Sequence, residues 1–196
     1  PAYRVDVQRE VDVIEEILRI YGLNAIPMPE QMRSSITAIA DRTALKAEEK
    51  IADQLAAKGY REVLNNSLSN PEYYSDRNTL VPILNPLSKE LEVMRQSMLF
   101  GGLSAIGWNL NRKRGNLRFF EFGKVYYQGA KGKYEEYRKL GIWLCGHRTE
   151  ESWRAKEEAF DFFDLKSSCL QILENLGIQR FKINEIKNHQ FAYGIE

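Results

Sequence analysis

Apolar positions recur every three or four residues in several stretches of the chain, which is the spacing that places side chains on one face of a helix. In the first stretch Ile14, Ile17, Leu18 and Tyr21 form such a stripe, and Gly22 follows as a residue type that commonly ends helices. The same spacing predicts four helices, over residues 12–21, from 41 or 43 to 58, over 99–110 and over 164–176. A short helical turn that begins with a proline is expected at 71–74.

Short runs of β-branched, aromatic or alternating apolar residues lie between these helices and are typical of strands. They fall at residues 3–7, 60–69, 117–127, 139–145 and 180–186. Strands and helices do not alternate strictly along the chain. This mixed order favours an α+β fold with antiparallel pairing over a doubly wound parallel sheet.

The composition is that of a soluble globular chain. Of the 196 residues 43% are hydrophobic and 28% are charged, which argues against intrinsic disorder. The net charge of +1 argues against a surface that is basic throughout, although it is compatible with a local basic patch. No run reaches the roughly 18 apolar residues of a membrane span. With only two cysteines, Cys145 and Cys169, the chain suits a reducing compartment. Because it starts at Pro1, we expect it to be a piece of a longer protein.

Four acidic residues near the start of the chain are a candidate metal site. Asp12, Glu15 and Glu16 lie within the first turn of the expected first helix, and Asp6 can fold back to the same place. Carboxylate oxygens are the ligands that Mg²⁺ and Ca²⁺ prefer. The same acids also suit the N-terminus of a helix, where Asp12 would be the N-cap and Glu15 would complete a capping box. Spacing alone favours capping and leaves the metal site open.

A basic run after the third expected helix is a second candidate site. Arg112, Lys113, Arg114 and Arg118 could contact phosphates. Cations are also favourable at the C-terminal end of a helix, so the spacing favours a solvated turn. No phosphate-binding loop, dinucleotide-binding motif, zinc-protease motif or nucleophile elbow occurs in the sequence.

Several longer motifs, taken together and in order, resemble a known family. The chain opens with Y-R-V-D-V-Q-R-E-V-D-V-I-E-E-I-L-R-I-Y-G-L-N-A-I-P, and it continues with G-Y-R-E-V-L-N-N-S-L (59–68), I-L-N-P-L-S-K-E-L-E-V-M-R-Q-S-M-L (83–99), N-x-x-R (109–112), F-F-E-F-G-K-V-Y (119–126) and F-D-F-F-D-L-K (160–166). These motifs are similar to those of bacterial phenylalanyl-tRNA synthetase beta subunits and cover nearly the whole chain.

The resemblance implies a class II aminoacyl-tRNA synthetase-like antiparallel sheet flanked by helices, preceded by the tail of a winged-helix-like B5 domain. Residues 1–30 would be the end of B5, 31–42 a linker, and 43–196 a catalytic-like module truncated at its C-terminus. In the family an alpha subunit activates phenylalanine with ATP and transfers it to tRNA(Phe). The beta subunit packs against it in an α₂β₂ heterotetramer. The resemblance therefore implies a cytoplasmic ligase subunit that does not contact membranes.

The resemblance also assigns roles to particular residues. It assigns Asp6, Asp12, Glu15 and Glu16 to Mg²⁺ in the intact enzyme. It implies that the third helix faces the alpha subunit or the paired beta module, through Gly101, Gly102, Leu103, Ile106, Gly107 and Leu110. No catalytic residue is expected, because an active class II site has an arginine two residues before the glutamate of its motif 2 strand. Here that position holds Phe119, and Arg118 would point to the opposite face of the sheet.

Two other functions stay open at this point. One is a stand-alone nucleic-acid-binding module that uses the B5 remnant and the basic run, with Arg112, Lys113 and Arg114 as its contacts. The other is a small class II-like ligase with an ATP site of its own, against which Phe119 counts. Both predict solution properties that a structural and assembly module lacks: a steep salt dependence of RNA binding in one case, and ATP–pyrophosphate exchange in the other.

Overall fold

The computed structural model describes residues 3–31, 34–35, 43–129, 132–149, 151–186, 191–192 and 194–196. The chain divides into two compact units, Pro1–Ala40 and Asp41–Glu196. In the described part of the chain, no helix combines the length and the apolar character that crossing a membrane requires.

The first unit contains one amphipathic helix, α1 (Glu10–Tyr21), followed by a 3-10 turn, η1 (Leu23–Ala25). The helix begins two residues earlier than the sequence predicts. Its N-cap is Arg9, so the prediction that Asp12 is the N-cap is wrong. Residues 3–7 form turns rather than the predicted strand. No residue of α1 is buried.

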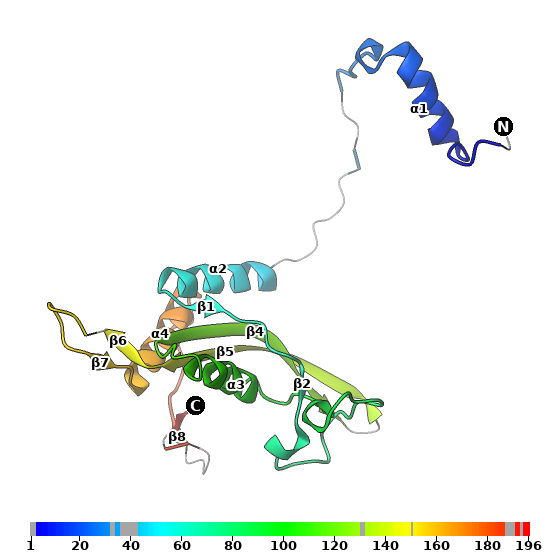
Figure 1. Ribbon diagram of the computed structural model, residues 1–196. Coiled ribbons are helices and arrows are strands. Elements are labelled where there is room, and N and C mark those ends of the chain that lie inside the picture. The colour runs from blue at the N-terminus through cyan, green and yellow to red at the C-terminus, as the bar shows by residue number, and fades with distance from the viewer. Residues whose placement is uncertain are drawn as a thin grey trace. The chain divides into compact units, whose positions relative to one another are not determined.

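The second unit is built on a three-stranded sheet in the order β1-β4-β5 (Figure 1). Strands β4 (Leu117–Gln128) and β5 (Tyr134–Cys145) form a long antiparallel hairpin. The short strand β1 (Arg61–Glu62) pairs in parallel with β4 at its other edge. The prediction of a strand over 60–69 is therefore only partly right, because pairing is confined to β1 and to β2 (Leu68–Ser69).

Helices cover both faces of this sheet (Figure 1). Alternate residues of β4 face opposite sides, and each side has its own hydrophobic core. On one side Phe120 packs with side chains of α2 (Thr43–Ala57) and α4 (Phe162–Asn175). On the other side Phe119 and Val125 pack with side chains of α3 (Leu99–Leu110) and its flanks. The four predicted helices are thus confirmed, with ends that differ by at most two residues.

The remaining elements are short. Strand β2 pairs with β3 (Val93–Met94), β6 (His147–Thr149) with β7 (Glu158–Ala159), and β8 (Glu185–Ile186) with β9 (Gly194–Ile195), all antiparallel. Two 3-10 turns, η2 (Pro71–Tyr73) and η3 (Lys89–Leu91), lie between β2 and β3. Of the predicted strand over 180–186, the structure has the two residues of β8, and Asn184 before them exchanges two backbone hydrogen bonds with Glu196. The proline-initiated turn predicted at 71–74 is confirmed as η2.

Candidate functional site

A buried ion pair lies on the face of the sheet that α3 covers. Arg95 Nη1 donates to Glu121 Oε1 over 2.8 Å, and the two side chains are only 6% and 1% exposed. Arg95 Nε also donates to the Lys124 carbonyl at 2.9 Å, and Asn65 Nδ2 donates to Glu121 Oε2 at 2.6 Å. Both carboxylate oxygens are therefore occupied by donors from this chain, and the cluster is arranged to hold segments together.

A cavity of about 290 Å³ opens beside this ion pair, between the segment 65–73 and α3. Its lining includes Asn65, Ser69, Tyr73, Ser97 and Phe100. The one cation in the lining, Arg95, is already paired with Glu121. Among the described lining residues the cavity thus offers amides, hydroxyls and the Glu90 carboxylate, but no unpaired cation that could hold the phosphates of ATP.

Phe119 occupies the strand position at which the class II pattern places its arginine. Its ring is buried, lies opposite Trp143 in the register of the hairpin, and packs in the core with Met98 and Ile106. Arg118 points to the other face, as predicted. There its Nη1 donates to the Lys58 carbonyl at 2.8 Å. The position two residues before Glu121 is therefore occupied by a buried phenylalanine and supplies no guanidinium to the face on which Glu121 lies.

The six residues predicted for a subunit interface divide into three groups. Gly102 and Ile106 are buried inside the chain, and a Cβ built on Gly102 would lie 2.0 Å from Trp143 Cε2. The expectation that these two face a partner is wrong, because they face the hydrophobic core. Gly101 lies against Asn65, at 3.0 Å from a built Cβ to the Asn65 Cβ. Leu103, Gly107 and Leu110 remain available: both leucines are about half exposed, and nothing lies within 4 Å of a Cβ built on Gly107.

The four acids predicted to bind Mg²⁺ each have a partner within the first unit. Asp6 pairs with Arg4 at 2.9 Å, which holds the pKa of its carboxyl below the usual range. Asp12 Oδ2 accepts from the backbone N–H groups of Gln8 and Arg9 at 3.0 and 2.8 Å.

Glu15 and Glu16 both lie near Arg19, at 3.6 and 3.7 Å. Among the described residues no group of three or more histidine, cysteine or acidic side chains is arranged to hold a metal ion. The capping function is thus met by Asp12 as the third helical residue, and the magnesium assignment stays a prediction.

The basic run does not form one continuous surface. Arg112 stacks over the ring of Trp108 at 3.4 Å and donates to its carbonyl. Lys113 and Arg114 are exposed in the turn. Arg118 points away to the Lys58 carbonyl. The predicted solvated turn describes residues 112–114 well, whereas Arg118 belongs to a different cluster.

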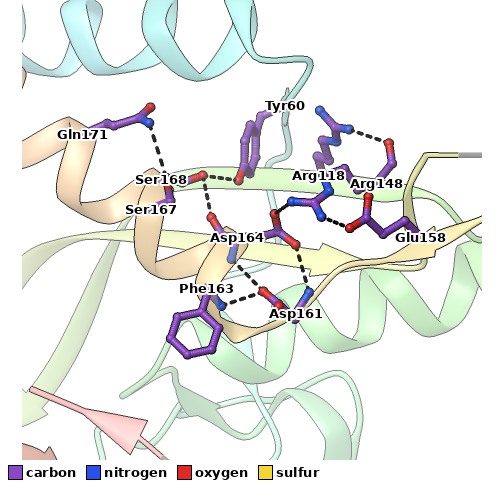
Figure 2. A network of polar contacts seen from close by, with 10 residues as sticks. All are labelled: Tyr60, Arg118, Arg148, Glu158, Asp161, Phe163, Asp164, Ser167, Ser168 and Gln171. Carbon is purple, nitrogen blue, oxygen red and sulfur yellow. Dashed lines mark hydrogen bonds and ion pairs between the residues drawn. The ribbon is translucent and has the colours of Figure 1, made fainter.

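That cluster is a polar network between the start of α4 and the end of the sheet (Figure 2). The Arg148 guanidinium lies between two carboxylates, donating to Asp164 at 2.9 Å and to Glu158. The Tyr60 and Ser168 hydroxyls lie 2.7 Å apart, and burial raises the pKa of the Tyr60 phenol. The network ties α4 to the hairpin β6–β7 and to the residue before β1.

Sequence reasoning missed this network because its members are spread from residue 60 to residue 171. One signal was available. In D-F-F-D-L-K, Asp161 and Asp164 have the spacing of a capping box, and the Asp161 side chain accepts from the N–H groups of Phe163 and Asp164. That spacing would have placed the start of α4 at Phe162, where the structure has it.

The sequence matches two family models. Residues 28–195 match the phenylalanyl tRNA synthetase beta chain CLM domain, which is most of the chain. The chain belongs to this family. Residues 1–23 match the tRNA synthetase B5 domain, and the described part of this stretch contains the turns at 3–7 and α1.

Members of the family from several bacteria are similar over almost the whole chain. A phenylalanine–tRNA ligase beta subunit of Bacteroides thetaiotaomicron is 43% identical over 91% of this chain and 23% of its own length. The corresponding protein of Porphyromonas gingivalis is 40% identical over 100% of this chain and 26% of its own length. The chain thus spans about a quarter of the length of these relatives.

Solved structures of other proteins share the fold of this chain. A pyrrolysyl-tRNA synthetase of Desulfitobacterium hafniense aligns with a TM-score of 0.55 at 17% identity, over 93% of this chain and 59% of its own. An ATP phosphoribosyltransferase regulatory subunit/histidyl-tRNA synthetase of Bacillus halodurans aligns with a TM-score of 0.53 at 18% identity, over 82% and 42%. The predicted α+β, class II synthetase-like fold is confirmed.

Proposed function

We propose that this chain is a structural and assembly module of the beta subunit of a phenylalanine–tRNA ligase, and that it does not itself catalyse. The observation that carries the proposal is its 43% identity to a protein of that name over 91% of the chain. The buried Phe119 and the closed Arg95–Glu121–Asn65 cluster support the non-catalytic part. A site for ATP on the face of the sheet that carries Phe119 and Glu121 would need a free cation to bind the phosphates.

The finer proposal concerns partners and place. We propose that the module packs against the alpha subunit of the ligase within an α₂β₂ heterotetramer, and that the assembled enzyme acts on tRNA(Phe) with ATP in the cytoplasm. We also propose the division into a B5 tail at 1–30, a linker at 31–42 and the core module at 43–196. The two family models, at 1–23 and 28–195, support a change of domain in this part of the chain.

Co-expression with the alpha subunit from the same source tests the assembly proposal. We expect a complex that survives size exclusion, with a mass by light scattering that accounts for both chains. Recovery of the two chains in separate peaks would contradict an interface within these residues.

A separate assay tests the non-catalytic part. We expect no phenylalanine-dependent ATP–pyrophosphate exchange by the chain alone, because the described residues of the face beside Glu121 present no free guanidinium. Measurable exchange would instead support the ligase with an ATP site of its own.

The resemblance to the family suggests that four acidic residues bind magnesium. The contacts that these four side chains make in the structure do not fit such a site. Each of the four acids is engaged by an arginine or by the helix N-terminus, and they form no shared set of oxygen ligands. We therefore expect at most weak binding, in roughly the millimolar range. Titration calorimetry of the chain and of an Asp12→Ala, Glu15→Ala variant tests this, and identical heats would remove these acids as ligands.

A further inference from the structure

The turn that follows α3 carries an excess of positive charge. No aspartate or glutamate occurs between Glu92 and Glu121, whereas five lysines or arginines do. Of these five, Arg95 is paired with Glu121, and Arg118 lies on the other face of the sheet. The remaining three have no ion pair with a carboxylate among the described residues. They are consecutive and form what we call the basic turn: Arg112, Lys113 and Arg114.

The basic turn is held against the last turn of α3. The Lys113 N–H donates to the Leu110 carbonyl at 2.9 Å. The Arg112 guanidinium stacks 3.4 Å from the centroid of the Trp108 ring and donates to the Trp108 carbonyl at 3.1 Å. The backbone therefore fixes the place of the turn, and the stacking fixes the Arg112 charge over an exposed aromatic ring.

The exposed side of α3 beside the basic turn is apolar and uncharged. Leu103, Leu110 and Trp108 are 49%, 46% and 54% exposed, and the surface at Gly107 is open. No residue of α3 carries a charge. A helix C-terminus favours cations by itself, but a solvated helix carries polar residues on its exposed side. An apolar side with tryptophan and arginine at its end instead matches a protein interface, where these residue types contribute most to binding.

Charge complementarity identifies the kind of occupant. Three adjacent cations without described acidic partners are complemented by carboxylates. A second copy of the chain offers none from α3 or the basic turn, so two copies of this surface do not complement each other. A nucleic acid would meet the cations, but Leu103 and Leu110 offer its bases no ring to stack on. One face of the Trp108 ring is already covered by Arg112.

We propose that the exposed side of α3 and the basic turn bind a segment of the alpha subunit that presents an apolar strip with carboxylates at one end. The inference rests on the proposed assembly with an alpha subunit and adds the chemistry of the contact. The apolar strip supplies affinity. The carboxylates fix its direction along α3 and accelerate association, because opposite charges steer the encounter of two proteins. The basic run of the sequence is thereby assigned to a protein contact.

The test is the dissociation constant of the purified chain and the alpha subunit from the same source, at low and at high salt. We expect the parent complex to weaken as salt screens its charges. Lys113→Glu with Arg114→Glu should weaken it about tenfold at low salt, by placing like charges together, and its salt dependence should disappear or change sign. Arg154→Glu with Lys156→Glu is the matched control and should leave the dissociation constant unchanged. It makes the same change of charge in the exposed turn between β6 and β7.

Two further variants cover the case in which the acidic replacements disturb the end of α3. Lys113→Gln with Arg114→Gln removes the charges without adding repulsion, and it should cause a smaller loss with a shallower salt dependence. Trp108→Ala should weaken binding about tenfold at both salt concentrations, because an apolar contact is not screened. Circular dichroism melts confirm that each variant is folded.

The outcomes separate this inference from the proposed assembly. Failure of the parent chain to bind the alpha subunit would overturn both. A complex whose dissociation constant is unchanged in the variants of the basic turn, or equally changed in the control, would overturn this inference alone. Self-association that these variants abolish would overturn it in favour of a second copy. Binding of single-stranded RNA that they abolish, with association to the alpha subunit unchanged, would overturn it in favour of a nucleic acid.

Discussion

At the scale of single residues, one ion pair is buried on the same face of the sheet as the hydrophobic core around Phe119 and Val125. Arg95 and Glu121 are almost fully buried, and their pairing joins the segment after β3 to the middle of β4. Burying two charges is costly unless each finds a partner, and here Asn65 and the Lys124 carbonyl complete the set. The pair therefore depends on both members being present.

Removing one member of this pair should destabilise the chain strongly. We expect Glu121→Leu to lower the free energy of unfolding by about 3–5 kcal/mol, because it leaves the Arg95 charge buried without a counter-charge. Replacing both residues, as Arg95→Met with Glu121→Leu, should recover much of this loss. Urea denaturation of the three proteins measures it, and a double variant less stable than Glu121→Leu would contradict the explanation.

Two glycines of the same helix should respond in opposite ways to alanine. A Cβ at Gly102 would lie 2.0 Å from Trp143 Cε2, so Gly102→Ala should cost about 1–3 kcal/mol through overpacking. A Cβ at Gly107 meets nothing within 4 Å, so Gly107→Ala should stabilise the helix by up to about 1 kcal/mol. Thermal melts of the two variants under the same buffer decide, and a shift of the same sign in both would count against this packing.

At the scale of elements, the sheet is a long hairpin to which helices are tied by side chains. One such tie joins α2 to β5: the Arg138 guanidinium donates to both Glu48 oxygens, at 2.7 and 2.6 Å. This two-point contact lowers the pKa of the Glu48 carboxyl below its ordinary value of 4.5. The cause is chiefly the hydrogen bonds from Arg138, which burial partly opposes.

The sign of that shift predicts how the tie depends on pH. A carboxyl whose pKa is lowered by folding stabilises the folded state above its unfolded-state pKa, and it loses that contribution as the pH falls through the folded-state pKa. At neutral pH we expect Glu48→Gln to cost about 0.2–1 kcal/mol, since the pair is partly exposed. The difference between wild type and variant should vanish in acid.

Denaturant unfolding at a series of pH values tests this, with Glu49→Gln as the control. Glu49 is the next residue of α2, is exposed, and has no ion pair among the described residues. A pH-independent difference for Glu48→Gln, or an equal effect of Glu49→Gln, would show that the Arg138 contact is not the cause.

At the scale of the whole molecule, the exposed side of α3 is the part of the predicted interface that the packing leaves free. Leu103 and Leu110 are 49% and 46% exposed, and the surface at Gly107 is open. If the proposed alpha subunit docks there, Leu103→Glu and Gly107→Leu should each weaken the complex at least tenfold, by placing a charge or extra bulk in an apolar contact. Leu84→Glu is the control, because Leu84 is 93% exposed in the turn before η3.

Size exclusion with light scattering, run over a dilution series, measures that loss. None of the variants should melt at a lower temperature than the parent chain, because Leu103 and Leu84 are exposed and a Cβ at Gly107 meets nothing within 4 Å. Unchanged association in both α3 variants would place the contact elsewhere on the chain. A loss in Leu84→Glu alone would move it to the turn between β2 and β3.

The sequence by itself determined the helices and the family. Helical periodicity is set by neighbours three and four residues apart, so α3 was predicted at both ends and the other helices within two residues. The motifs from 59 to 166 indicated the family. The phenylalanine at position 119, where an active class II site has an arginine, led to the expectation that the chain does not catalyse. These features are properties of short stretches and need no partner from elsewhere in the chain.

Only the tertiary structure decided which distant residues meet. Strand β5 begins at Tyr134, five residues before the predicted start, because pairing with β4 orders polar residues that have no strand pattern of their own. The Arg95–Glu121 pair and the hydrogen bond from Arg118 to the Lys58 carbonyl join residues 26 and 60 positions apart. Such contacts depend on strand register and on which face of the sheet each helix covers. The local spacing of apolar residues determines neither of these.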